Sequence, residues 1–167
     1  MSLDRPLAAR VEQLITALGR ETSLMTELGA ALARQRDDVA RSDVPGLESD
    51  VAVAGRIMLT LQEAGRLRGS VLLAMGVDRE QPLAQLAATL PPPLAARLEA
   101  ARVALAGAAA QATREAGISA RVLRSAIHAG DAYLQALFTG PFVTPYAPAD
   151  GRGTPPARAG VLVDKVA

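Results

Sequence analysis

Few polar side chains in this sequence are spaced so that they could do chemistry together. The chain has no cysteine and a single histidine, His128, which excludes disulfides and metal clusters built on cysteine or histidine. Asp37 and Asp38 are neighbours on a predicted helix, so their side chains diverge and we expect both to be solvated. His128 and Asp131 suggest a surface contact, and the Gly-Arg-Gly of 151–153 lacks the strand and Lys-Ser/Thr of a phosphate loop. The sequence predicts no enzyme, no metal and no cofactor.

Two features are better suited to binding another protein. The first is a set of large apolar residues in the second half of the last long helix, Val122, Leu123, Ile127, Leu134, Leu137 and Phe138. Such a set either forms ordinary core or lines a groove that receives an amphipathic helix of a partner. It is also compatible with a homo-oligomer.

The second feature is Tyr146 in the segment "VTPYAPADG". The chain has four aromatic residues, and all lie between Tyr133 and Tyr146. Prolines on both sides of Tyr146 favour an extended backbone. Tyr146 is either a loop residue packed on its own bundle or the aromatic anchor of a short docking motif.

Composition limits the remaining function classes. The net charge is +1 and the acidic and basic residues are interspersed, so the basic stripe typical of nucleic-acid binding is absent. The first residues carry charges and no apolar signal core, and no apolar run approaches the ~20 residues that span a bilayer. We expect a cytoplasmic protein without membrane insertion.

The elements that must position these residues are long helices. Helices are predicted over Pro6–Arg41, Val44–Met75 and Pro92–Phe138, with a short one over Pro82–Leu90. The expected fold is all-α: an elongated antiparallel helical hairpin or three-helix bundle over 1–138, followed by an extended, flexible Pro/Gly-rich tail over 139–167. The first helix has an apolar seam, a line of residues along one face at alternating spacings of three and four, by which it should pack on its neighbours. The seam comprises Leu7, Val11, Leu14, Leu18, Met25, Leu28, Leu32 and Val39, with Glu21 and Gln35 as polar members.

The other two long helices have predicted seams of their own. In the second helix the seam is Leu47, Val51, Ala54, Met58, Leu61, Val71 and Met75, and a Gly65–Gly69 pair should allow close helix approach. In the last helix the first half is lined mostly by small residues, Leu94, Leu98, Ala101, Leu105, Ala108 and Ala112.

The order of these features resembles the FlgN family of flagellar export chaperones over roughly residues 7–153. The resemblance follows four segments in order, "RQRDDVARSDVPGLESDVAVAGRIMLTLQ", "LRGSVLLAMGVD", "LRSAIHAGDAYLQALFTG" and "TPYAPADGRG". The last of these is similar to the family's Tyr-x-x-x-Gly tail.

The resemblance implies a cytoplasmic chaperone for flagellar type III protein export. Its clients would be the C-terminal amphipathic helices of hook-filament junction proteins (FlgK/FlgL-like), which it would deliver to the export gate. Tyr146 matches the tail tyrosine that contacts the gate protein FlhA in that family. The alternative from a different class is a phasin-like structural protein that coats polymer granules or lipid surfaces with amphipathic helices.

Overall fold

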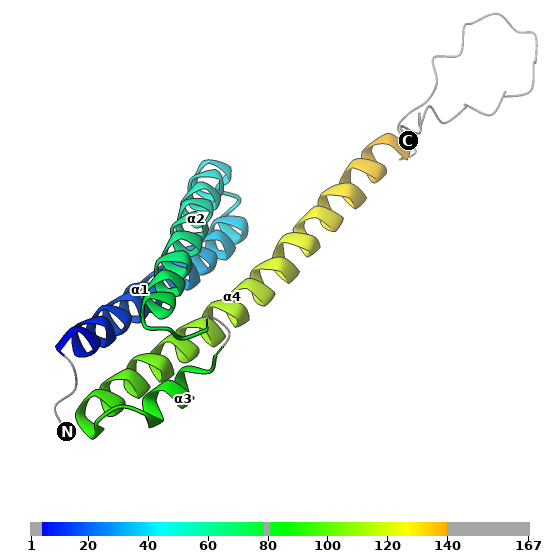
Figure 1. The fold of residues 1–167 in the computed structure, drawn as a ribbon. Helices are drawn as coiled ribbons and strands as arrows, with labels where there is room; N and C mark the ends of the chain where they lie inside the picture. Colours follow the sequence, from blue (N-terminus) through cyan, green and yellow to red (C-terminus); the bar gives the residue numbers. More distant parts are fainter. Residues whose placement is uncertain (1–4, 79–80, 140–167) are drawn as a thin grey trace, which may run out of the picture. The chain divides into compact units, whose positions relative to one another are not determined.

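Helices make up all the regular structure in the residues that the structure describes. The computed structural model describes residues 5–78 and 81–139, which hold α1 (Arg5–Arg41), α2 (Val44–Ala74), α3 (Leu83–Ala88) and α4 (Pro92–Thr139) (Figure 1). The all-α class is therefore confirmed, and the helix bounds lie within one or two residues of those predicted. The chain divides into two units between Gly130 and Asp131. The first unit holds α1, α2, α3 and most of α4, and the second begins within α4.

α1 and α2 form an antiparallel hairpin (Figure 1). Its seam includes the two polar residues expected from the heptad pattern, Glu21 and Gln35, which are both buried. Val11, Leu14 and Leu18 of α1 are completely buried. Glu21 continues this seam at 5% exposure, with its Oε1 3.1 Å from Nε of Arg68 in α2. The seam of α1 is thus confirmed, and its acidic member lies in the interface because α2 supplies a cation opposite it.

A second polar contact fixes the hairpin about two helical turns before its tip. The Nε2 of Gln35, which is 5% exposed, donates to the backbone oxygen of Asp50 at 3.2 Å. The Nε of Arg34 donates to both carboxylate oxygens of Asp50 at 3.1 Å. Asp50 therefore receives both contacts, and together with the Glu21–Arg68 pair they set the register of α1 against α2.

The predicted seam of α2 is only partly correct. Val51 and Met58 are each 52% exposed, although the pattern placed them in the interface. The residues of α2 that are buried are mostly small, namely Ala54, Ala64, Gly69 and Leu72. Small side chains allow the backbones to approach closely, so the interface follows them and turns Val51 and Met58 outward. Gly69 is buried in the interface, whereas a Cβ at Gly65 would meet nothing within 4 Å, so the expected close approach is wrong for Gly65.

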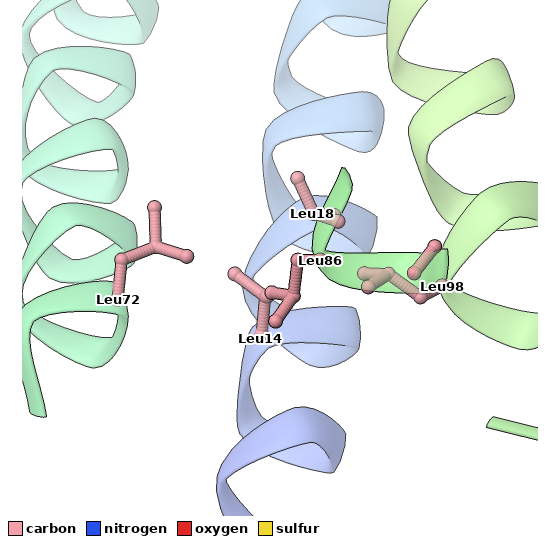
Figure 2. Close-up of a cluster of buried hydrophobic side chains, with 6 residues drawn as sticks. Leu14, Leu18, Leu72, Leu86 and Leu98 are labelled. Atoms are coloured by element: carbon pink, nitrogen blue, oxygen red, sulfur yellow. The ribbon is translucent and has the colours of Figure 1, made fainter. Parts of the chain in front are cut away.

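The main core lies where all four helices meet. Leu14 and Leu18 of α1 contact Leu72 of α2, the short α3 and Leu98 of α4 (Figure 2). Leu98 is completely buried, and Leu86 and Ala87 of α3 are buried nearly as well. The six-residue α3 therefore contributes its apolar side chains to the core at one end of the bundle.

α4 runs parallel to α1. The guanidinium of Arg97, near the start of α4, pairs with Glu12, near the start of α1, and Arg36, near the end of α1, pairs with Glu115 further along α4. Ala112 is buried, and Gly29 of α1 lies close to it, since a Cβ at Gly29 would be 3.9 Å from the Ala112 Cα. Small residues on both helices thus allow this half of α4 to lie close to α1.

The two helices of the hairpin end in the same way, with different residues. After each helix a backbone N–H is donated to the carbonyl five positions earlier, from Asp43 to Asp38 after α1 and from Val77 to Leu72 after α2. This hydrogen bond is typical of a Schellman motif. The residue before the donor has a positive φ, +73° for Gly76 and +56° for Ser42. Serine carries a Cβ penalty in this conformation that glycine does not.

Candidate partner-binding surface

A polar clamp holds α4 against the end of α1. The Nη2 of Arg36 lies 2.6 Å from Oε2 of Glu115, and both side chains are largely buried. One turn further on, Ser119 is 2% exposed and its hydroxyl donates to the backbone oxygen of Leu32 at 2.8 Å. The Nη1 of Arg36 also donates to the Ser119 hydroxyl at 3.3 Å. The clamp sets the position of the next turns of α4, which carry Leu123 and Ile127.

Beyond the clamp, the first unit has an apolar groove of about 380 Å3 between the α1–α2 turn and α4, which we call the turn groove. This volume is within the ~300–1,000 Å3 range of small-molecule and cofactor pockets. Its apolar walls come from both sides, and its lining residues are Asp38, Val39, Ser42, Asp43, Val44 and Leu47 from the hairpin, with Leu123, Ala126 and Ile127 from α4. The lining thus combines aliphatic side chains with two carboxylates and includes no basic residue.

Asp38 is the buried polar residue of the turn groove. It is 5% exposed, so the expectation that it is solvated is wrong, whereas Asp37 is exposed as expected. Its Oδ1 accepts from Nη2 of Arg41 at 2.6 Å, while its Oδ2 is buried and has no hydrogen-bond partner among the described residues. The chain reverses within two residues after α1, and this brings the start of α2 over the Asp38 side chain.

The second carboxylate of the groove belongs to Asp43, which caps α2. Its Oδ1 accepts the backbone N–H of Gly46 at 3.1 Å, which is the hydrogen bond typical of an aspartate N-cap. A Cβ at Gly46 would lie 2.5 Å from Oδ2 of Asp43 and 3.1 Å from Cγ of Asp38. Both carboxyl groups therefore lie close to the Cα of Gly46, which carries no side chain.

The predicted apolar set on α4 falls into two groups. Val122 and Leu123 are half-buried and Ile127 is 62% exposed, and of these Leu123 and Ile127 line the turn groove. In the second unit Leu134, Leu137 and Phe138 are all exposed, at 51%, 54% and 77%. For these four exposed residues, Ile127 included, the ordinary-core alternative is therefore wrong.

The structure also places the polar candidates raised by the sequence. His128 and Asp131 are exposed, and no group of three metal-ligating residues occurs within 5–78 and 81–139. Tyr146 and the tail over 139–167 were predicted to dock and to be flexible; apart from Thr139, which ends α4, these residues lie outside the described ones.

Sequence reasoning missed the hairpin side of the turn groove. The signal was present for Val39, which the heptad pattern assigned to the apolar seam of α1. Nothing in the spacing alone shows that α4 would reach the turn, because the order of packing depends on the segment between α2 and α4.

Comparison with known proteins adds no relative. The chain gives no significant match to a protein-family model, to a curated protein or to a solved structure. Among the described helices, none is both long enough and apolar enough to cross a membrane.

Proposed function

We propose that this protein is a cytoplasmic chaperone of flagellar type III export. It binds the C-terminal amphipathic helices of hook-filament junction proteins (FlgK/FlgL-like) and brings them to the export gate protein FlhA. The proposal includes no catalytic step. It rests on the resemblance of four sequence segments to the FlgN family and on one structural observation, the apolar surface of α4 after residue 120.

That observation supports a binding role because large apolar side chains are exposed where a partner could cover them. Ile127, Leu134, Leu137 and Phe138 are each more than half exposed. Leu134 and Phe138 are four residues apart on a helix and share a face, which is the spacing that an apolar partner helix needs. A monomer gains nothing from exposing these side chains, whereas a disordered client segment could fold onto them.

The test uses the full chain and a synthetic peptide of the C-terminal helix of a hook-filament junction protein from the same genome. Leu137→Asp should weaken binding of this peptide at least tenfold by calorimetry, because a charge replaces an apolar anchor. Val103→Asp is the matched control, since Val103 lies on the same helix at the same 54% exposure and outside the proposed surface. Equal affinities of the two variants for the peptide would contradict the proposal.

A phasin-like coat is the second candidate, and exposed apolar residues on α2 favour it. Val51, Met58, Leu59, Leu67 and Leu73 are each at least 52% exposed. A coat protein should sediment with liposomes or polymer granules in the absence of any protein partner. An export chaperone should stay in the supernatant and form a complex of fixed stoichiometry with its client.

A further inference from the structure

We infer that the turn groove selects a partner helix that carries a basic side chain next to its apolar face. This inference rests on the proposed function and adds the chemistry of the client. Its basis is the pair of carboxylates, Asp38 and Asp43, set within aliphatic walls.

Charge complementarity is the first argument. The groove lining holds two carboxylates and no basic residue, and both carboxyl groups approach the same point at Gly46. Arg41 compensates one oxygen of Asp38, and the backbone N–H of Gly46 binds one oxygen of Asp43. Each carboxylate thus keeps a second oxygen for which the described residues supply no hydrogen bond. A lysine or arginine on a partner would complement both.

The burial of Asp38 is the second and independent argument. Buried carboxylates are normally hydrogen-bonded through their available oxygens, because an unpaired one loses its hydration without compensation. Asp38 is only 5% exposed, and its Oδ2 has no hydrogen-bond partner in the described part of the chain. An ammonium or guanidinium that entered the groove would supply the missing donor.

The apolar walls identify the rest of the ligand. Val39, Leu47, Leu123 and Ile127 are aliphatic, and no aromatic residue lines the groove. At the other end of the bundle, α3 fills the space between α1 and α4 with Leu86 and Ala87. A helix with leucine and alanine on its apolar face therefore already packs in this bundle. The expected ligand is such a helix with one Lys or Arg beside the leucines.

The experiment compares two synthetic peptides with the full 167-residue chain. Both are 18-residue amphipathic helices with leucines at spacings of three and four, alanines between them and glutamines on the polar face. They differ at one position next to the leucines, which is Lys in one peptide and Gln in the other. We expect the Lys peptide to bind at least tenfold more tightly by calorimetry, and this advantage should shrink in 1 M NaCl, where charges are screened over ~3 Å.

Two variants assign the charge effect to this groove. Asp43→Asn keeps a good helix cap, since asparagine caps as well as aspartate, and Asp38→Asn keeps the size of the side chain. Combined, they should bring the affinities of the Lys peptide and the Gln peptide to within twofold of each other. Circular dichroism at 222 nm tests whether the double variant is folded. If it is unfolded, the single variant Asp43→Asn, which preserves the cap, takes its place. This variant should reduce the affinity ratio of the Lys peptide to the Gln peptide at least threefold.

The outcomes separate this inference from the proposed function. Equal affinity of the unmodified chain for both peptides, or a Lys advantage unchanged in the variants, overturns the inference and leaves the chaperone proposal standing. Equal affinities of the Leu137→Asp and Val103→Asp variants for the junction-protein peptide overturn the chaperone proposal, whatever the Lys and Gln peptides show. If Ile127→Asp dissociates a homodimer of the free chain in sedimentation, the occupant of the groove is a second copy and the inference is wrong.

Discussion

Replacing Arg68 by methionine tests the buried ion pair of the hairpin seam. The side chain of Glu21 is 7% exposed and that of Arg68 is 34% exposed. Methionine retains an apolar stem of similar length and removes the cation, so Glu21 remains buried without its partner. Removing one partner of a fully buried pair costs ~3–5 kcal/mol. Because water reaches Arg68, we expect a smaller loss in the free energy of unfolding, about 2 kcal/mol at pH 7.

The pH dependence of this loss in unfolding free energy shows whether the charge on Glu21 causes it. Burial raises the pKa of Glu21 above its ordinary 4.5, and the charge of Arg68 opposes that rise. A carboxyl group with a raised pKa in the folded state contributes stability that is present below its unfolded pKa and lost as pH rises through its folded pKa. Removing Arg68 should raise the pKa of Glu21 further. The deficit of Arg68→Met should therefore shrink on acidification from pH 7 towards pH 4.5.

Urea unfolding followed by circular dichroism at 222 nm measures both effects. Glu21→Gln is the control background, since glutamine does not titrate and leaves no buried charge when Arg68 is replaced. In that background, Arg68→Met should cost less than about 1 kcal/mol at every pH. An equal loss at pH 7 and pH 4.5, or an equal loss with glutamine at position 21, would refute the assignment of the effect to an uncompensated carboxylate.

Three further predictions concern the helix ends, the core and the tail. Ser42→Gly should stabilise the fold by about 0.5 kcal/mol and Gly76→Ser should destabilise it by about 1 kcal/mol, because both positions have a positive φ; thermal unfolding measures both. Leu98→Ala should cost about 3 kcal/mol in urea unfolding, since Leu98 is completely buried, whereas Val103→Ala, at 54% exposure, should cost less than 0.5 kcal/mol. Tyr146→Ala should weaken binding to the cytoplasmic domain of FlhA by calorimetry and leave binding of the junction-protein peptide unchanged, so equal gate affinity would contradict the docking role.

The elements of this fold could be predicted because local signals mark them. Pro92 opens α4, Asp43 caps α2 and Gly76 ends it, and each signal acts through its own backbone. The seam of α1 could also be predicted, including Glu21 and Gln35, because a three-four spacing fixes one face of a helix whatever packs on it.

The seam of α2 and the turn groove could not be predicted in the same way. Val51 and Met58 have the right spacing for the interface, but α2 approaches α1 most closely along the small residues Ala54 and Ala64. Sequence spacing alone does not show whether side-chain size or periodicity decides which face of a helix is buried. The burial of Asp38 depends on the position of α2 above it after the reversal. Such tertiary effects override a local pattern.

The burial of α4 changes along its length, and this bears on how a partner could bind. Leu98, Ala112 and Ser119 are buried, but no residue from 120 to 138 is. Ser119 of the clamp is thus the last buried residue along α4 among the described residues, and the turns after it are at most half-buried. A partner that covers the later turns removes apolar surface from water without opening the core, so its affinity is not reduced by a cost of local unfolding. The apolar excess on α4 is placed where covering it requires the least rearrangement of the bundle.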